Sequence, residues 1–168
     1  MPPKTEDEGQ DDIDPAKLEL LYTGSFYDFR KLGHLLQAVV DIPGARLNVA
    51  TIAAPSELLR MVDSYPESFR LLGFLSHRRA LEMQRGCDVL VNLANENPVQ
   101  VPGKLYEYLG AGVPVLHVGG KADDAASGLL AITGVGVCER DDYVAIRNRL
   151  QQWMAEKSLN GHLQLPRN

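Results

Sequence analysis

A lysine and a glutamate three positions apart are the residues whose types and spacing most clearly suggest chemistry in this chain. Lys104 and Glu107 lie in the segment Val101–Leu116, which reads VPGKLYEYLGAGVPVL. The i,i+3 spacing places both side chains on one face of a helix. Lys104 falls in the first helical turn, where the macrodipole disfavours a cation by about 0.3–1 kcal/mol. A bound phosphate would explain the lysine, and a ligand hydroxyl would suit the glutamate. The alternative is an exposed ion pair with no ligand.

The sequence around this pair predicts a strand, a short helix and a second strand. The apolar run Val89–Leu93 precedes it, Pro102 and Gly103 begin the helix, and Gly110 and Gly112 end it. Both strands are apolar throughout, as is typical of parallel strands that are buried on both faces. Such a βαβ unit places the helix entrance at the carboxyl end of its first strand, where open α/β sheets bind ligands.

The rest of the chain alternates short β-rich runs with amphipathic stretches, which predicts an α/β fold with a Rossmann-like, doubly wound, six-stranded parallel sheet. The predicted strands are Leu18–Thr23, Arg46–Ile52, Phe69–Leu72, Val89–Leu93, Pro114–Val118 and Gly136–Cys138. The predicted helices are Lys31–Val40, Ser56–Tyr65, His77–Arg85, Gly103–Gly110, Ala122–Ile132 and Asp141–Lys157. Ser56 and Ser76 are the predicted N-caps of two of them.

Four loops therefore follow the carboxyl ends of strands: Gly24–Arg30, Gly73–His77, Ala94–Lys104 and His117–Lys121. Backbone N–H groups after Gly24 could hold a phosphate, although a simple tight turn also explains this glycine. Phe74 could stack on a base or could be a core residue. For His117 we favour a structural residue at a strand end over a catalyst.

Four segments resemble the retaining glycosyltransferases of the B-type fold, the group 1 family that uses nucleotide-activated sugars. They follow one another along the chain in the same order as in that family. Val101–Leu116 is similar to the family's donor-sugar motif, and Leu20–Phe26 to its first strand and glycine loop. Arg70–Phe74 resembles the segment that flanks the base, and Leu81–Val91 the helix and strand before the donor loop. The resemblance extends from Leu18 to Trp153 and implies the C-terminal, donor-binding half of such an enzyme.

The resemblance also implies roles for individual residues. Lys104 would bind the phosphate of the donor, and Arg30 or Lys31, the basic residues that follow the glycine loop, would be the further candidates for neutralising the leaving diphosphate. The implied donor-binding residues are Gly24, Ser25, Gly73, Phe74, Val99, Gln100, Lys104, Leu105 and Glu107. This chain departs from the family pattern at two of these positions, since Ser25 stands where many relatives carry an arginine and Val99 where they carry a first glutamate.

By resemblance, the full enzyme would transfer a sugar from a nucleotide-sugar to an acceptor with retention, with the nucleotide-sugar as substrate and without a metal or another cofactor. An N-terminal domain that holds the acceptor would be the missing partner, so we expect this chain to be an excised domain that is inactive alone. Two alternatives remain open: a noncatalytic nucleotide- or phosphate-binding module, and a sugar-nucleotide epimerase of the same fold. A dinucleotide-binding dehydrogenase is disfavoured because residues 24–29, GSFYDF, lack the G-x-G-x-x-G spacing.

Length and charge agree with one domain behind an acidic leader. The chain has 168 residues, and its net charge of -5 is concentrated at the start, where Met1–Ala16 holds six acidic residues and only Lys4 as a base. We expect residues 1–16 to be a disordered acidic linker and residues 17–168 to form the nucleotide-sugar-binding domain. The remaining sixteen basic and sixteen acidic residues balance, which argues against a nucleic-acid partner.

The cysteines, the histidines and the hydropathy of the sequence indicate the compartment in which the protein is expected. Cys87 and Cys138 are the two cysteines, too few for a disulfide scaffold, and the four histidines lack zinc-ligand spacing. No apolar run approaches the ~20 residues that a transmembrane helix needs. We therefore expect a cytoplasmic protein, with the inner membrane surface as the place where the full enzyme would work.

Overall fold

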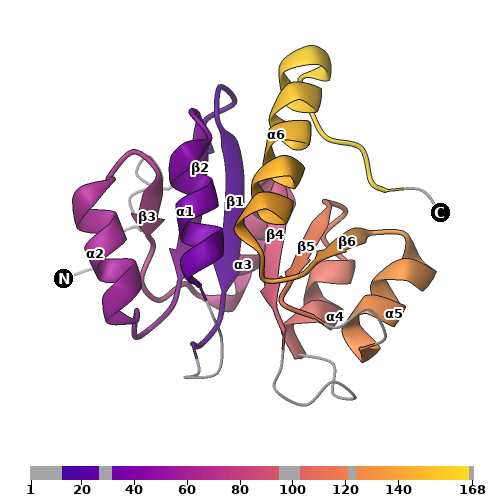
Figure 1. Cartoon of the computed structure of the whole chain (residues 1–168). Helices are drawn as coiled ribbons and strands as arrows, with labels where there is room; N and C mark the ends of the chain where they lie inside the picture. Colours follow the sequence, from indigo (N-terminus) through magenta and orange to yellow (C-terminus); the bar gives the residue numbers. More distant parts are fainter. Residues whose placement is uncertain (1–12, 27–31, 95–102, 121–123, 167–168) are drawn as a thin grey trace.

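The computed structural model describes residues 13–26, 32–94, 103–120 and 124–166, and within them six parallel strands form one sheet (Figure 1). The strands are β1 (Leu18–Thr23), β2 (Ala45–Ala50), β3 (Phe69–Leu71), β4 (Val89–Leu93), β5 (Val115–Val118) and β6 (Gly136–Glu139). Their order in the sheet is β3-β2-β1-β4-β5-β6. The predicted six-stranded parallel sheet is confirmed, and its topology reverses between β1 and β4.

Helices cover both faces of the sheet. They are α1 (Gly33–Asp41), α2 (Ser56–Ser64), α3 (His77–Gly86), α4 (Gly103–Leu109), α5 (Ala125–Thr133) and α6 (Tyr143–Asn160). Buried side chains of α1, α2 and α6 form one core cluster with the sheet, and those of α3, α4 and α5 form a second cluster on the other face. In Figure 1, α1 and α6 lie side by side against the sheet. None of the helices in the described ranges is long and apolar enough to span a membrane.

Of the two predicted N-caps, Ser76 is confirmed and Ser56 is wrong. Ser76 caps α3, because its side chain accepts a hydrogen bond from the backbone N–H of Arg79 at 3.2 Å. The prediction for Ser56 is wrong, since this residue is the first of α2. Pro55 takes the N-cap position with φ -65° and ψ 153° and offers no side-chain bond. The fixed φ of proline already provides the extended geometry that the position needs.

The described chain begins to contribute contacts at Ile13, four residues before the predicted domain start at residue 17. Ile13 packs against the second core cluster, and the backbone N–H of Asp14 donates to Glu19 Oε2 at 3.1 Å. Residues 1–12 lie outside the described residues, so the acidic linker stays a prediction there.

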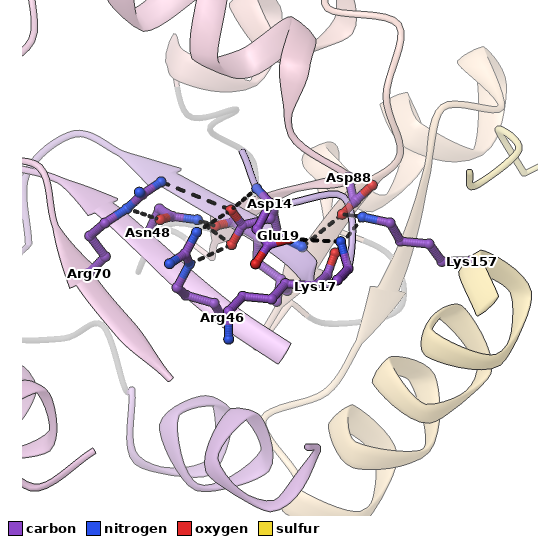
Figure 2. Close-up of polar contacts among 10 residues, drawn as sticks. Asp14, Lys17, Glu19, Arg46, Asn48, Arg70, Asp88 and Lys157 are labelled. Atoms are coloured by element: carbon purple, nitrogen blue, oxygen red, sulfur yellow. Dashed lines mark hydrogen bonds and ion pairs between the residues drawn. The ribbon is translucent and has the colours of Figure 1, made fainter. Parts of the chain in front are cut away.

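A buried ionic network lies at the amino ends of the strands, opposite the edge where the helices α1 and α4 begin. Glu19 of β1 lies at the centre of this network (Figure 2), and its side chain is fully buried. Arg46 of β2 donates to both carboxylate oxygens, at 2.7 and 2.6 Å, and Asn48 donates at 3.4 Å. Arg70 of β3 lies 4.0 Å from Glu19 and donates to Asn48 at 2.7 Å. Charged groups from three strands thus compensate one another at this end of the sheet.

The same network reaches the last helix. Lys157, near the end of α6, is 8% exposed; it donates to Asp88 Oδ2 at 2.6 Å and to the backbone carbonyl of Lys17 (Figure 2). Asp88 also accepts from the backbone N–H of Glu19 at 2.8 Å. One lysine therefore ties the start of β1, the start of β4 and the end of α6 together.

Candidate functional site

A cavity of about 170 Å³ lies at the carboxyl end of the sheet, beside the point where the strand order reverses. The ends of β1, β2 and β3 and the starts of α3 and α4 surround it. Its lining residues are Thr23, Gly24, Ser25, Ala50, Thr51, Ile52, Gly73, Phe74, Leu75, Ala80 and Lys104. Five of the predicted site residues, drawn from three segments far apart in the sequence, therefore meet at one cavity, where a doubly wound sheet is expected to bind its ligand.

The turn after β1 forms one wall of this cavity. Gly24 has a φ of +127°, which an L-residue rarely adopts, and its N–H donates to the carbonyl of Ala50 at 3.0 Å. The hydroxyl of Tyr22 donates to the carbonyl of Ser25 at 2.6 Å, and the Tyr22 ring stacks on Phe26 with centroids 4.5 Å apart. A Cβ at position 24 would lie 3.9 Å from the Lys104 side chain. Gly24 is thus required by the positive φ of the turn, whereas a Cβ there would make only ordinary van der Waals contact with Lys104.

The turn after β3 also lines the cavity. Gly73 has a φ of +67°, in the left-handed region that favours glycine. Phe74 is 77% exposed, so the alternative that it is a core residue is wrong. Ile52, on the same cavity, is 88% exposed. These two exposed apolar side chains of the cavity lining leave a surface on which a flat ring can stack.

Lys104 and Glu107 form the ion pair that the spacing predicted as the alternative to ligand binding. Lys104 Nζ lies 3.2 Å from Glu107 Oε1 and 3.4 Å from Oε2. The lysine side chain is 40% exposed and lines the cavity, whereas Glu107 is 22% exposed and lies just outside its lining. The negative charge of Glu107 therefore offsets part of the electrostatic cost of placing a cation at the N-terminal end of the helix dipole. The flexible, exposed ammonium group remains free to reach an anion in the cavity.

A second group, which the sequence did not point to, also holds Glu107. The side chain of Gln84 in α3 is fully buried, and its Nε2 donates to Glu107 Oε1 at 2.6 Å. Burial alone would raise the pKa of Glu107, but the hydrogen bonds from Gln84 and Lys104 outweigh it and lower that pKa. The only signal in the sequence was a polar residue beside Met83, on the buried stripe of a helix.

Tyr108 is a second contributor missed by the site prediction. Its ring is buried, and its hydroxyl accepts from the backbone N–H of Thr23 at 3.0 Å and lies 3.0 Å from Thr23 Oγ1. Burial raises the pKa of Tyr108, so the hydroxyl keeps its proton. Helix α4 is thereby joined to the last residue of β1, directly before Gly24. Leu105, predicted as a donor-binding residue, has its side chain fully buried in the second core cluster and away from the cavity.

His117 is a buried structural residue of β5, as favoured from the sequence. Its ring is fully buried, with Nδ1 2.8 Å from Asn92 Nδ2 and Nε2 3.1 Å from Asp124 Oδ2. Asp124 also caps α5 by accepting from the N–H of Ser127 at 2.7 Å. Both ring nitrogens therefore have partners within the fold.

The remaining predicted site residues lie outside the described residues. These are Arg30, Lys31, Val99 and Gln100, and their assigned roles stay predictions. Among the residues that the structure does describe, no three His, Cys, Asp or Glu side chains come close enough together to hold a metal ion.

Comparison with known proteins identifies the fold. No protein-family model matches the chain, and no curated protein matches its sequence significantly. Solved structures do match. WaaG, a glycosyltransferase involved in lipopolysaccharide biosynthesis, superposes with a TM-score of 0.69 at 16% identity, over 89% of this chain and 41% of that one. HepE from Anabaena, in complex with UDP, gives 0.68 at 13% identity, over 88% and 42%. UDP-GlcNAc 2-epimerase from Neisseria meningitidis, bound to UDP-GlcNAc, gives 0.61 at 12%, over 88% and 38%.

The chain thus has the Rossmann-like fold found in B-type glycosyltransferases, as the resemblance of its segments implied. It spans about two fifths of the length of the structures that it matches.

Proposed function

We propose that this chain is the donor-binding domain of a retaining, metal-independent glycosyltransferase that takes its sugar from a nucleotide-sugar. The observation that carries the proposal is the meeting of Gly24, Ser25, Gly73, Phe74 and Lys104 at one cavity beside the reversal of strand order. All five belong to the donor-binding set that the resemblance of the sequence implies. A complex of a fold neighbour, HepE, with UDP supports a nucleoside diphosphate group as the ligand.

Each part of the cavity has a task in this proposal. The ammonium of Lys104 turns from Glu107 to the diphosphate and stabilises the negative charge that grows as the glycosidic bond breaks. The turn at Gly24 brings backbone close to the phosphates, and the exposed ring of Phe74 stacks on the base. Glu107 accepts hydrogen bonds from the ribose hydroxyls. Arg30 or Lys31, a few positions after Gly24 in the sequence, supplies further positive charge for the diphosphate.

In this proposal, an N-terminal domain binds the acceptor and forms the second wall of the cleft. Positioning of two substrates supplies a large part of a transfer reaction's rate, so the isolated chain binds the nucleotide but turns over nothing. Retention of configuration and independence from metal rest on the resemblance of the donor motif. Two free cysteines suit the cytoplasm, where thiols stay reduced.

Calorimetric titration of Lys104→Ala with UDP tests the proposal. We expect the variant to bind UDP about 10- to 150-fold more weakly than the wild type, because a hydrogen bond to a charged group contributes about 1.5–3 kcal/mol. Uridine, which has no phosphate, should bind both proteins equally. Arg85→Ala is the matched control, since this exposed cation lies at the far end of α3, away from the cavity. Equal UDP affinity of the wild type and Lys104→Ala would refute the proposal.

An epimerase is the second candidate, because a sugar-nucleotide epimerase shares this fold over a similar part of the chain. The two activities differ in their products. The chain joined to an N-terminal domain is incubated with a panel of UDP-sugars and candidate acceptors, and the products are analysed by mass and NMR. A transferase releases UDP and a glycosylated acceptor, whereas an epimerase returns a UDP-linked epimer. Robust transfer by the isolated chain would contradict the half-enzyme interpretation.

A further inference from the structure

The buried amide of Gln84 is not explained by the needs of the fold. Its Nε2 donates to Glu107 at 2.6 Å, but within the described ranges no donor reaches its Oε1. A buried carbonyl oxygen without a hydrogen bond costs stability, so an apolar side chain of similar length would serve the core better. The glutamine is therefore better explained by what it does to Glu107.

The hydrogen bond makes the two oxygens of Glu107 inequivalent. Oε1 accepts from Gln84 at 2.6 Å and from Lys104 at 3.2 Å. Oε2 has Lys104 alone within reach among the described residues, at the longer distance of 3.4 Å. Because Gln84 is fully buried and Glu107 is partly exposed, the bond turns Oε1 inward and leaves Oε2 on the solvent side.

We propose that Gln84 is a positioning residue, which orients Glu107 so that Oε2 receives the ribose hydroxyls of the bound nucleotide. The inference rests on the proposed function, in which Lys104 leaves Glu107 for the diphosphate. At that moment the carboxylate loses its ion pair and would be free to rotate. The bond from Gln84 remains and keeps Oε2 directed outward.

The charged groups around Glu107 agree with this role. Lys104 approaches from α4 itself, and the His77 side chain acts on it from the start of α3. Lys104 lines the cavity, where an anion competes for it. Gln84 is uncharged and lies behind the carboxylate, so its contribution does not change when an anion binds.

The test compares Gln84→Met with the wild-type chain in three measurements: affinity for UDP, affinity for 2′-deoxy-UDP, and the pKa of Glu107 followed by NMR of the labelled carboxyl carbon. We expect the preference for UDP over 2′-deoxy-UDP to fall about three- to tenfold, since a misdirected hydrogen bond weakens steeply. We expect the pKa of Glu107 to rise, because the charged form loses a donor. The thermal midpoint should stay within about 3 °C of the wild type or increase.

Two controls isolate the role. Gln37→Met removes a similar glutamine-to-carboxylate bond, to Asp41 on the exposed face of α1, and should alter neither the preference nor the pKa of Glu107. In a Glu107→Gln background, Gln84→Met should cause no further loss of preference if Gln84 acts through Glu107. Should Gln84→Met fail to fold, Gln84→Leu takes its place.

The outcomes separate this inference from the proposed function. An unchanged preference and an unchanged pKa of Glu107 in Gln84→Met would overturn the positioning role. A wild-type chain that binds neither UDP nor another nucleoside diphosphate would refute the proposed function and with it the ribose contact, whereas a raised pKa of Glu107 in Gln84→Met would still show that Gln84 holds the Glu107 carboxylate. A fall in preference that persists in the Glu107→Gln background would also overturn the inference.

Discussion

Glu19→Gln is expected to destabilise the fold strongly, because it removes the central charge of the buried network. The carboxylate is fully buried and accepts two bonds from Arg46, one from the backbone of Asp14 and one from Asn48. A glutamine offers one acceptor oxygen in place of two, and its amide group would face donors. Some of these donors must therefore lose their partners.

The magnitude follows from the burial of the pair. Removing one member of a buried ion pair costs about 3–5 kcal/mol. The Arg46 side chain is 16% exposed, so water can partly solvate the orphaned guanidinium, and the lower end of that range applies. For a domain of this size, about 3 kcal/mol corresponds to a decrease in thermal midpoint of roughly 6–12 °C.

Urea unfolding followed by the fluorescence of Trp153, the single tryptophan, measures the effect. Glu82→Gln is the control: it breaks an exposed pair with Arg78 and Arg79, so it should cost less than about 1 kcal/mol. A loss below about 1 kcal/mol in Glu19→Gln would refute the account of the network.

The pH dependence gives an independent check. Burial raises the pKa of Glu19, but the bonds from Arg46, Asp14 and Asn48 outweigh it, and the net pKa is lowered. A carboxylate with a lowered folded-state pKa stabilises the fold above the unfolded-state pKa of about 4.3, and this contribution is lost as the pH falls through the folded-state value. The stability difference between wild type and Glu19→Gln should be constant near neutral pH and shrink below about pH 4. A difference that stays constant down to pH 3 would contradict the lowered pKa.

Two further predictions concern the other parts of the fold. Tyr108→Phe leaves the buried N–H of Thr23 without its acceptor and should lower the free energy of unfolding in urea by about 1–3 kcal/mol. Tyr106→Phe, at an exposed position of the same helix, is the control and should change this free energy very little. Equal effects of the two substitutions would contradict the role of the buried hydroxyl. Deleting residues 1–12 should leave the thermal midpoint unchanged. Deleting residues 1–14 should lower it by a few degrees, because Ile13 contacts the second core cluster and Asp14 contacts Glu19 of the ionic network. Equal midpoints for the two truncations would contradict a folded domain that begins at Ile13.

The arrangement of strands and helices was accessible from local patterns. Each predicted strand overlaps an observed one, and β1 and β4 have the predicted bounds, because apolar runs between turn residues report burial on both faces directly. The predicted start of α2 at Ser56 is confirmed, but its N-cap is Pro55, because Pro55 and Ser56 both fit a helix entrance and only backbone geometry distinguishes them. Of the candidate site, the residues after the strands were accessible for the same reason: a parallel sheet places all carboxyl ends of its strands at one edge.

By itself, the sequence determined the α/β alternation, the glycine turns after β1 and β3, and the i,i+3 pair on α4. These features depend on neighbours within a few residues, where period and turn chemistry act. Only the tertiary structure decided which distant side chains complete the site. Gln84 reaches Glu107 across 23 positions, and Tyr108 reaches Thr23 across 85. Such pairings depend on how two helices and a strand pack in three dimensions, and no spacing within one element encodes that packing.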